Sequence, residues 1–205
     1  MEAVNAPTQR HRGREAQRLE TRKRVFEAAV AEFKRTGTAG ADVGAIIDAA
    51  GVARGTFYFH FPSKEHVLLE LERREEARVA KEFARFAARP HDLPGALRKA
   101  VQLVLSVERR VGAILFKDVL GLHFAPTRPP DDEWTDHPLI VLVVEEISRA
   151  RDNSEAAREV DPFHSAVFFL LGLYALLTTT SDSKSVRAAM LDNYVTVALR
   201  GMEPR

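Results

Sequence analysis

The sequence predicts an all-α protein with a small N-terminal helical domain and a larger C-terminal one. Apolar residues recur at helical spacing along most of the chain, and no segment alternates polar and apolar residues as a half-buried strand would. Glycine, proline and capping residues divide the chain into about nine helical segments. The 205 residues, 45% of them hydrophobic, are enough for two modest cores.

The chain begins with a polar, arginine-rich stretch. Residues 1–18 contain almost no apolar side chains, so burial cannot offset the cost of ordering them, and we expect a flexible basic arm. From Thr21 the pattern becomes helical, with an apolar stripe over residues 25–33 at spacings of three and four. Gly37 provides a stop for this first helix.

Two very short helices follow. Asp42 is a good N-cap for an apolar segment over residues 43–50, and Gly51 can adopt the left-handed conformation of a sharp turn. Residues 54–60 form the next helix, which Pro62 ends. Two short helices joined by a tight glycine turn predict a helix-turn-helix.

A long helix comes next. Ser63 is its predicted N-cap, and the helix reaches to about residue 88. Residues 70–76 are almost wholly charged, which favours a solvated connector between two cores. We therefore divide the chain into a helix-turn-helix domain over residues 19–66 and a second domain over residues 67–205.

The second domain should contain four or five further helices, each with a recognisable start or stop. These signals are Asp92 with Pro94, Gly112, Gly121, Pro138, Asp161 with Pro162, and Gly201. The longest apolar run, residues 166–177, is more typical of a buried helix than of a membrane span, and we expect no membrane partner.

Charge and composition limit the classes of function and the partners that this chain can have. Basic residues outnumber acidic ones in residues 1–64, and the reverse holds in the rest, which points to nucleic acid as the partner of the first part. The absence of cysteine and of an N-terminal apolar signal suits the cytoplasm. The histidines lack metal-ligand spacing, and neither a G-x-S-x-G nor a phosphate-binding glycine loop occurs, so we expect no metal, cofactor or catalysis.

The segment from Thr21 to Leu68 resembles the DNA-binding domain of TetR-family transcriptional regulators. The matching residues are Thr21-Arg22, Ala28-Ala29, Phe33, Gly37, Ala50-Gly51-Val52, Gly55-Thr56-Phe57-Tyr58, His60-Phe61 and Ser63-Lys64-Glu65. The resemblance implies a three-helix DNA-binding domain followed by a ligand-binding and dimerisation domain. It also implies a repressor that binds a palindromic operator and is released by a ligand.

The DNA-contacting residues can be proposed from their chemistry. The N-terminal half of a recognition helix faces base edges, so Arg54, Thr56 and Phe57 are candidates for reading sequence, and Gly55 lets the backbone approach DNA closely. Tyr58, His60 and Lys64 suit phosphate contacts, a role that the resemblance also gives to Tyr58 and Lys64. For Phe57 and for Phe61 the alternative is a place in the core of the small domain.

Three residues depart from the family pattern. Asp42 stands where a threonine or serine usually touches a phosphate, and its carboxylate repels DNA. Ala53 replaces a serine cap, at a cost of roughly 1 kcal/mol. Ile47 occupies a position where a small alanine normally lets two helices approach. These departures affect the details of DNA contact more than the fold.

The C-terminal part is expected to form a homodimer and to bind a ligand. Residues 162–179 are apolar almost all round, so the helix needs cover on more than one side, and a charge at Phe169 or Leu173 should yield monomers. By resemblance, the last two helices of each subunit form the dimer interface. The expected pocket for a hydrophobic effector is lined by Glu108, Phe116, Leu120, His123, Trp134, Val143, Val167 and Tyr174.

Two other classes of function remain open at this point. A helical regulator that binds only protein would have the same composition but no salt-dependent DNA binding. An enzyme whose site is assembled from the C-terminal helices would leave no sequence motif.

Overall fold

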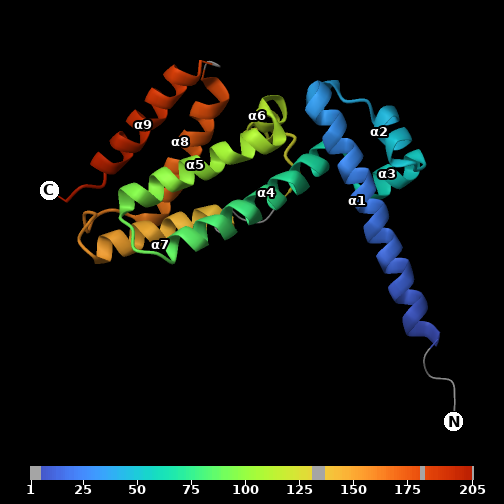
Figure 1. Cartoon of the computed structure of the whole chain (residues 1–205), viewed down its shortest axis with the longest axis horizontal. Helices are drawn as coiled ribbons and strands as arrows, with labels where there is room; N and C mark the ends of the chain where they lie inside the picture. Colours follow the sequence, from blue (N-terminus) through green and yellow to red (C-terminus); the bar gives the residue numbers. More distant parts are fainter. Residues whose placement is uncertain (1–5, 131–136, 181–182, 205) are drawn as a thin grey trace, which may run out of the picture.

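The computed structural model describes residues 6–130, 137–180 and 183–204, and in these ranges it contains nine α-helices and no strand, which confirms the all-α prediction (Figure 1). An N-terminal lobe and a C-terminal lobe are bridged by α4. The helices are α1 (Ala6–Gly40), α2 (Val43–Ala50), α3 (Arg54–His60), α4 (Lys64–Ala87), α5 (Leu93–Val111), α6 (Ala113–Leu122), α7 (Pro138–Asp152), α8 (Pro162–Thr179) and α9 (Lys184–Arg200).

The N-terminal lobe packs α1, α2 and α3 around a small aromatic core. Phe33, Phe57 and Phe61 are fully buried, so both Phe57 and Phe61 belong to this core. Asp42 caps α2 by accepting a hydrogen bond from the Gly44 backbone nitrogen, as expected. Gly51 ends α2 with a φ of 62°, the left-handed conformation predicted for the turn before α3.

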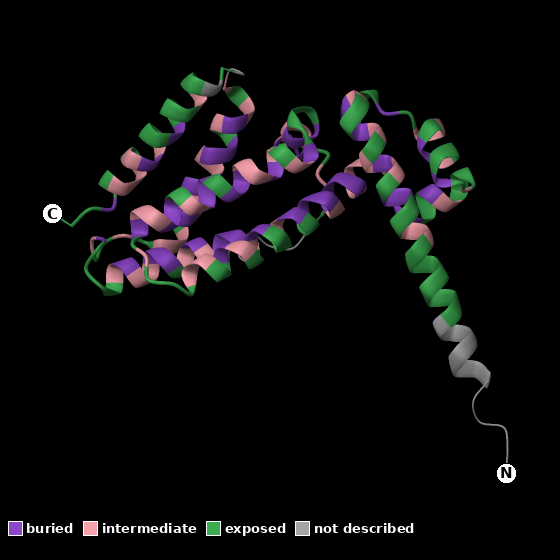
Figure 2. Ribbon diagram, in the orientation of Figure 1, coloured by how far each residue is buried: buried purple, intermediate pink, exposed green. Residues whose placement is uncertain are grey.

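The structure corrects the expected flexible arm. Helix α1 begins at Ala6, and residues 13–20 form an exposed extension of it away from the body of the molecule (Figures 1 and 2). The predicted stop at Gly37 is a break with a φ of 72°, after which a short helical segment runs to Gly40. At this break the Thr38 backbone nitrogen donates to the Asp118 Oδ2 of α6, at 2.6 Å, so the end of α1 is tied to the C-terminal lobe.

Helix α4 crosses the predicted domain boundary without interruption, and its charged segment is not a solvated connector. Glu72 and Glu75 are buried, and they pair with Arg128 and Arg110, respectively, in the C-terminal lobe. The expectation of solvation was wrong because these partners are distant in sequence and cover α4 only in the folded chain.

The C-terminal lobe is built from α4 to α9, and buried residues follow the inner faces of its helices (Figure 2). Asp92 caps α5 through Gly95, and Asp161 caps α8 through His164, both as the sequence predicts. Helix α9 approaches α8 closely at Gly172, where an added Cβ would lie 2.5 Å from the Tyr194 hydroxyl oxygen.

A buried ion pair joins the start of the C-terminal lobe to α7. His91 Nε2 lies 2.6 Å from Glu146 Oε2. Burial lowers the pKa of His91, but its hydrogen bonds to the Arg89 carbonyl and to Glu146 outweigh burial and raise the pKa above the usual value. A raised pKa in the folded state stabilises the protein below the pKa of the unfolded chain and ceases to do so as pH rises through the folded-state pKa.

We therefore expect His91→Gln to destabilise the protein more at pH 6 than at pH 9. At pH 6 the loss should be about 1–3 kcal/mol, the size of a hydrogen bond to a charged group. Urea denaturation of both proteins at the two pH values measures the difference. An equal loss at both pH values would mean that the imidazole acts only by packing.

Candidate nucleic-acid interface and effector cavity

Helix α3 presents one exposed face to solvent. Arg54, Gly55, Tyr58 and Phe59 are exposed on it, and Thr56 is half-buried. The Arg54 guanidinium lies 5.9 Å from the centre of the Tyr58 ring, so the two side chains lie together on the surface. A guanidinium, a phenol hydroxyl and an exposed ring at the start of a short helix suit contact with a DNA groove and its phosphates.

Two predicted DNA-contacting side chains, those of Phe57 and His60, are buried in the structure. The Phe57 ring is fully buried, so it faces the core rather than DNA. His60 is also buried, and burial followed by the charges of Arg22 and Arg18 lowers its pKa, which favours a neutral imidazole over a phosphate-binding cation. Sequence reasoning missed Phe59, which is exposed on the same helix.

The Lys64 ammonium group is hydrogen-bonded to backbone carbonyl groups of its own domain. Its Nζ donates to the carbonyl oxygens of Thr38 at 2.6 Å and of Ala39 and Ala41 at 3.3 Å. The charge of Lys64 thus holds the end of α1 against the start of α4. In this conformation a phosphate would have to share or replace those carbonyl groups.

Gly55 offers a direct test of close approach by DNA. A Cβ at this position would meet nothing within 4 Å, so no contact inside the protein requires a glycine there. Gly55→Ala should therefore leave the protein as stable or raise its stability by up to about 1 kcal/mol, because alanine favours helix. We expect the same variant to lower DNA affinity, measured by fluorescence anisotropy, because the methyl group would separate the backbone from the DNA.

The DNA affinity of Gly55→Ala shows whether Gly55 allows close approach to DNA or has no role in binding. Unchanged affinity of the stable variant would contradict a close approach of the α3 backbone to DNA. Gly121→Ala serves as the matched control, since it makes the same change in another helix, α6, where an added Cβ also meets nothing within 4 Å.

A cavity of about 40 Å³ lies inside the C-terminal lobe, mainly between α4, α5 and α6. Four predicted ligand-binding residues line it, namely Phe116, Leu120, His123 and Tyr174. A smaller adjoining cavity is lined by Val167 together with His123 and Tyr174. The structure thus brings these five of the eight predicted residues together.

The other three predicted residues lie elsewhere. Glu108 does not line the cavity, because it pairs with Arg187 of α9 at 2.8 Å. Val143 is fully buried in α7 and lines neither of the two cavities. Trp134 lies outside the described residues.

Sequence reasoning missed the charged part of the cavity. Glu72, Glu75 and Glu76 of α4 line it, three carboxylates among mostly apolar neighbours. Burial raises the pKa of Glu72, although Arg128 opposes this rise by donating to both of its carboxylate oxygens at 2.9 and 3.0 Å. The carboxylates were recognisable in sequence as charges at i, i+3 and i+4 on one helix, but nothing near them in sequence indicates burial.

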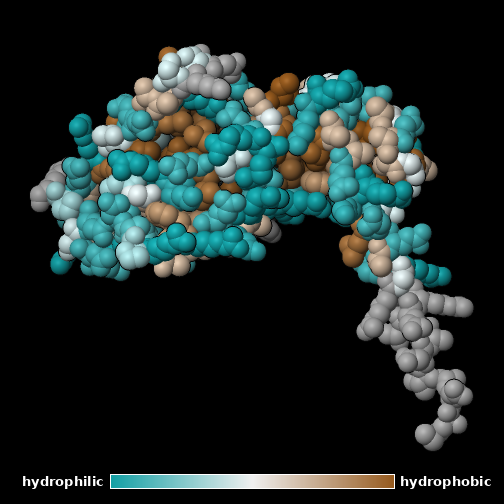
Figure 3. All heavy atoms as spheres, viewed as in Figure 1, coloured by the Kyte–Doolittle hydropathy of each residue, from teal (hydrophilic) through white to brown (hydrophobic). Residues whose placement is uncertain are grey.

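Helices α8 and α9 expose apolar residues that the subunit itself does not cover. Phe168 is 68% exposed on α8, while Val186, Met190 and Val197 are 50%, 40% and 59% exposed on one stripe of α9. Figure 3 shows apolar atoms at the surface between α9 and α5, in the region of α8. We call these four residues the α8/α9 surface.

The expectation that a charge at Phe169 or Leu173 yields folded monomers is wrong. Both side chains are buried within their own subunit, so a charge at either position would disrupt the core rather than only an interface. Among the described residues, α8 alone is long and apolar enough to cross a membrane by length and composition, a test that a core helix of a soluble protein also passes. Its extensive packing against α7 favours the second explanation.

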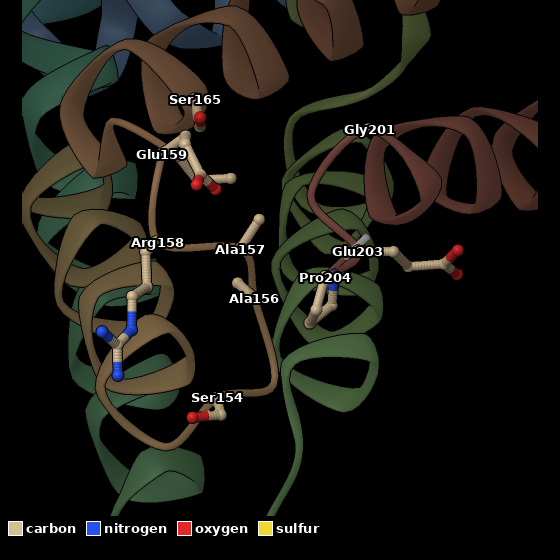
Figure 4. A pocket seen from close by; sticks show the side chains of 10 residues that line it. Ser154, Ala156, Ala157, Arg158, Glu159, Ser165, Gly201, Glu203 and Pro204 are labelled. Atoms are coloured by element: carbon tan, nitrogen blue, oxygen red, sulfur yellow. The ribbon is translucent and has the colours of Figure 1, made fainter.

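An open groove of about 740 Å³ lies at the opposite end of the C-terminal lobe from α3. The loop before α8, including Ala156 and Ala157, forms one side, and the C-terminal tail from Gly201 to Pro204 forms the other (Figure 4). The Ala157 backbone nitrogen donates to the Met202 carbonyl oxygen at 2.8 Å and ties the two sides together. None of the predicted ligand-binding residues lies in it.

In the described residues, nine helices form an N-terminal helix-turn-helix lobe and a second helical lobe with a small cavity, an architecture that suits a DNA-binding regulator. Residues 25–71 match the family model described as "Bacterial regulatory proteins, tetR family". The matched segment contains the end of α1, α2, α3 and the start of α4, and its family model describes regulatory proteins.

Individual relatives agree with this assignment. The chain is 36% identical over 114 residues to the HTH-type transcriptional repressor KstR of Mycobacterium tuberculosis, which covers 52% of this chain and 51% of that protein. It is 32% identical over 87 residues to the HTH-type transcriptional regulator AcrR of Shigella flexneri, which covers 42% and 40% of the two chains. The matched part thus spans about half the length of these curated relatives or less.

Solved structures extend the similarity to the whole fold. The structure of FadR from Thermus thermophilus, a TetR-family repressor in complex with lauroyl-CoA, has a TM-score of 0.72 at 22% identity and covers 90% of this chain and 96% of its own. AibR in complex with isovaleryl coenzyme A and operator DNA has a TM-score of 0.59 at 18% identity, with 86% and 97% covered. At these identities the likeness establishes the fold alone.

Proposed function

We propose that this chain is a transcriptional repressor that binds a palindromic operator as a homodimer and leaves it when a small effector binds. The observation that carries the proposal is the exposed face of α3, with Arg54, Gly55 and Tyr58, in a domain that matches the TetR family. Arg54 and Thr56 read bases, and Tyr58 binds phosphate. His60 and Lys64 act mainly by holding the domain together.

The homodimer forms through α8 and α9. Two copies of the α8/α9 surface can cover each other around a two-fold axis, which also suits the two-fold symmetry of a palindrome. This pairing removes large apolar side chains from water, a contribution of roughly 25 cal/mol per Å² of apolar area.

The effector is a small molecule with a large apolar part. Apolar side chains line most of the cavity, and the Tyr174 and His123 side chains offer polar groups in its wall. The cavity of about 40 Å³ has room for little more than water, so an effector has to push the surrounding helices apart. The acyl-CoA esters bound to the structural neighbours FadR and AibR are the first compounds to test.

Helix α6 connects this movement to the DNA-binding lobe. It lines the cavity with Phe116 and Leu120, and its Asp118 accepts a hydrogen bond from the end of α1. Displacement of α6 therefore shifts the N-terminal lobe and changes the distance between the two recognition helices of the dimer. Effector binding favours the state in which that distance no longer matches successive major grooves, about 34 Å apart.

The domain division and the location follow from this function. Residues 19–66 bind DNA, and residues 67–205 bind the effector and the second subunit, with α4 common to both. A protein that works on genomic DNA belongs in the cytoplasm of a bacterial cell.

Selection of bound genomic fragments tests the proposal. The purified full-length chain is mixed with sheared genomic DNA, bound fragments are sequenced, and compounds are then screened for release of the best fragment. We expect enrichment of fragments that share an inverted repeat, with release by at least one apolar compound. A regulator that binds only protein would enrich no fragment at any salt concentration.

A further inference from the structure

Two carboxylates and an imidazole converge at the wall of the effector cavity. Glu72 and Glu76 lie one turn apart on the same face of α4, and His137 is the residue that precedes α7. One ligand atom from each of the three side chains lies within 4.8 Å of the other two. His137 Nδ1 lies 3.1 Å from both carboxylate oxygens of Glu76.

A second histidine borders this group. His123 Nε2 lies 3.3 Å from Glu72 Oε1, and the centres of the His123 and His137 rings are 6.4 Å apart. Glu72 is only 3% exposed and Glu76 is partly buried, so two carboxylates are held close together with little access to water. Such an arrangement costs free energy unless positive charge compensates it.

The positive charge in the structure compensates only part of this cost. Arg128 donates to both oxygens of Glu72 and His123 lies beside Oε1, but a carboxylate oxygen has two lone pairs, so Oε2 can still accept one further ligand. Glu76 has no Lys or Arg within salt-bridge distance among the described residues, and its contact is with His137. Glu72, Glu76 and Arg128 together carry one net negative charge, so the group attracts a cation.

Tyr174 adds a polar group to the same part of the cavity wall. It is only 8% exposed, it lines both cavities beside Glu76 and His123, and its ring lies 4.9 Å from the His123 ring. Burial, followed by the nearby charges of Glu76 and Glu72, raises the pKa of its hydroxyl, which therefore stays protonated. A protonated hydroxyl in the cavity wall can donate a hydrogen bond to a group that enters the cavity.

We propose that Glu72, Glu76 and His137 form a binding site for one divalent transition-metal ion of the Zn²⁺ type. Carboxylate oxygen together with imidazole nitrogen is a ligand set for Zn²⁺, whereas Mg²⁺ and Ca²⁺ select oxygen ligands alone. Three protein ligands leave a fourth position, which faces the cavity and can take water or an acidic group of the effector. The ligands come from two segments more than 60 residues apart, so the sequence contains no metal-binding motif.

The metal-binding claim is independent of DNA binding. Only its regulatory consequence, that the ion anchors or replaces the effector, rests on the proposed function. Metal content and DNA affinity are therefore measured separately on the same preparations.

The test uses the full-length chain, freed of metal with a chelator and titrated with Zn²⁺ by calorimetry. We expect one Zn²⁺ per chain, and at least about tenfold weaker binding for Glu76→Gln and for His137→Ala. The matched control is His164→Ala, which removes an exposed histidine that lies beside an acidic residue, Asp161, elsewhere in the lobe. Affinity equal to wild type in both ligand variants, or a control that weakens binding as much, would overturn the proposal.

A spectroscopic measurement on the wild-type chain covers the case in which a ligand variant fails to fold. X-ray absorption of the Zn²⁺-loaded protein should contain nitrogen and oxygen neighbours at about 2.0–2.2 Å and the outer-shell signal of imidazole. Absence of stoichiometric zinc, or a shell without imidazole, would contradict the site. A metal-free chain that binds no operator, but still takes up one Zn²⁺ per chain, would instead count against the proposed function.

Discussion

A chain that carries both Phe168→Glu and Val197→Glu is expected to be a folded monomer with little affinity for its operator. The two side chains are 68% and 59% exposed in the single subunit, so glutamate at either position is solvated and compatible with the subunit fold. In the proposed dimer both positions are covered by the second copy. Burial of carboxylates without partners then costs several kcal/mol, more than a modest interface can supply.

Loss of the dimer should affect DNA binding far more than the loss of one contact would. A monomer reaches a single half-site, and joining two half-sites through a dimer raises affinity by a factor on the order of 10²–10⁴. Sedimentation velocity measures the oligomeric state, and anisotropy with the selected fragment measures affinity.

A matched control is available on the same lobe. Phe124→Glu places the same charge at another exposed aromatic residue, outside the α8/α9 surface, and should leave both measurements unchanged. A double variant that still sediments as a dimer would exclude the α8/α9 surface as the interface.

Arg54→Ala is the second change with a large expected effect. Arg54 is exposed at the first position of α3, so its loss should not alter the stability of the domain. An arginine that binds a guanine with two hydrogen bonds contributes about 1–3 kcal/mol of discrimination, and the dimer loses this contribution in each half-site. We expect operator affinity to fall by at least about tenfold and base preference to relax at one position of each half-site.

The base preference of Arg54→Ala shows whether Arg54 reads a base or only contributes positive charge. In competition between the operator and its single-base variants, the Arg54→Ala protein should lose discrimination at one position only. Arg85→Ala removes an exposed arginine from the last turn of α4, at the end of that helix away from α3, and should change neither affinity nor preference (Figure 1). If Arg54→Ala weakened binding to every sequence equally, Arg54 would be a phosphate contact.

The local features of the fold were predictable because they depend on neighbours in sequence. Asp42, Asp92 and Asp161 cap helices, and Gly51 turns the chain, through contacts that span only a few residues. The burial of Phe57 is less local. A phenylalanine on a recognition helix suits either DNA or the core, and only the packing of α1 against α3 decides between them.

The charged cavity wall was not predictable because its partners come from distant segments. The sequence predicts that Glu72 and Glu75 are solvated, yet in the folded chain they pair with Arg128 and Arg110, respectively. The same limit applies to Glu108, whose partner on α9 is almost 80 residues away and holds it outside the cavity. Helical periodicity identifies a face, whereas the identity of what covers that face depends on tertiary packing.

Protection of the selected operator against cleavage tests the central claim most directly. The account predicts two protected half-sites on one face of the DNA, about one helical turn apart, with two chains bound per fragment. Affinity should exceed that for a scrambled fragment by a factor on the order of 10³ or more at physiological salt. Equal affinity for the operator and the scrambled fragment, with protection spread evenly along both, would contradict sequence-specific regulation by this chain.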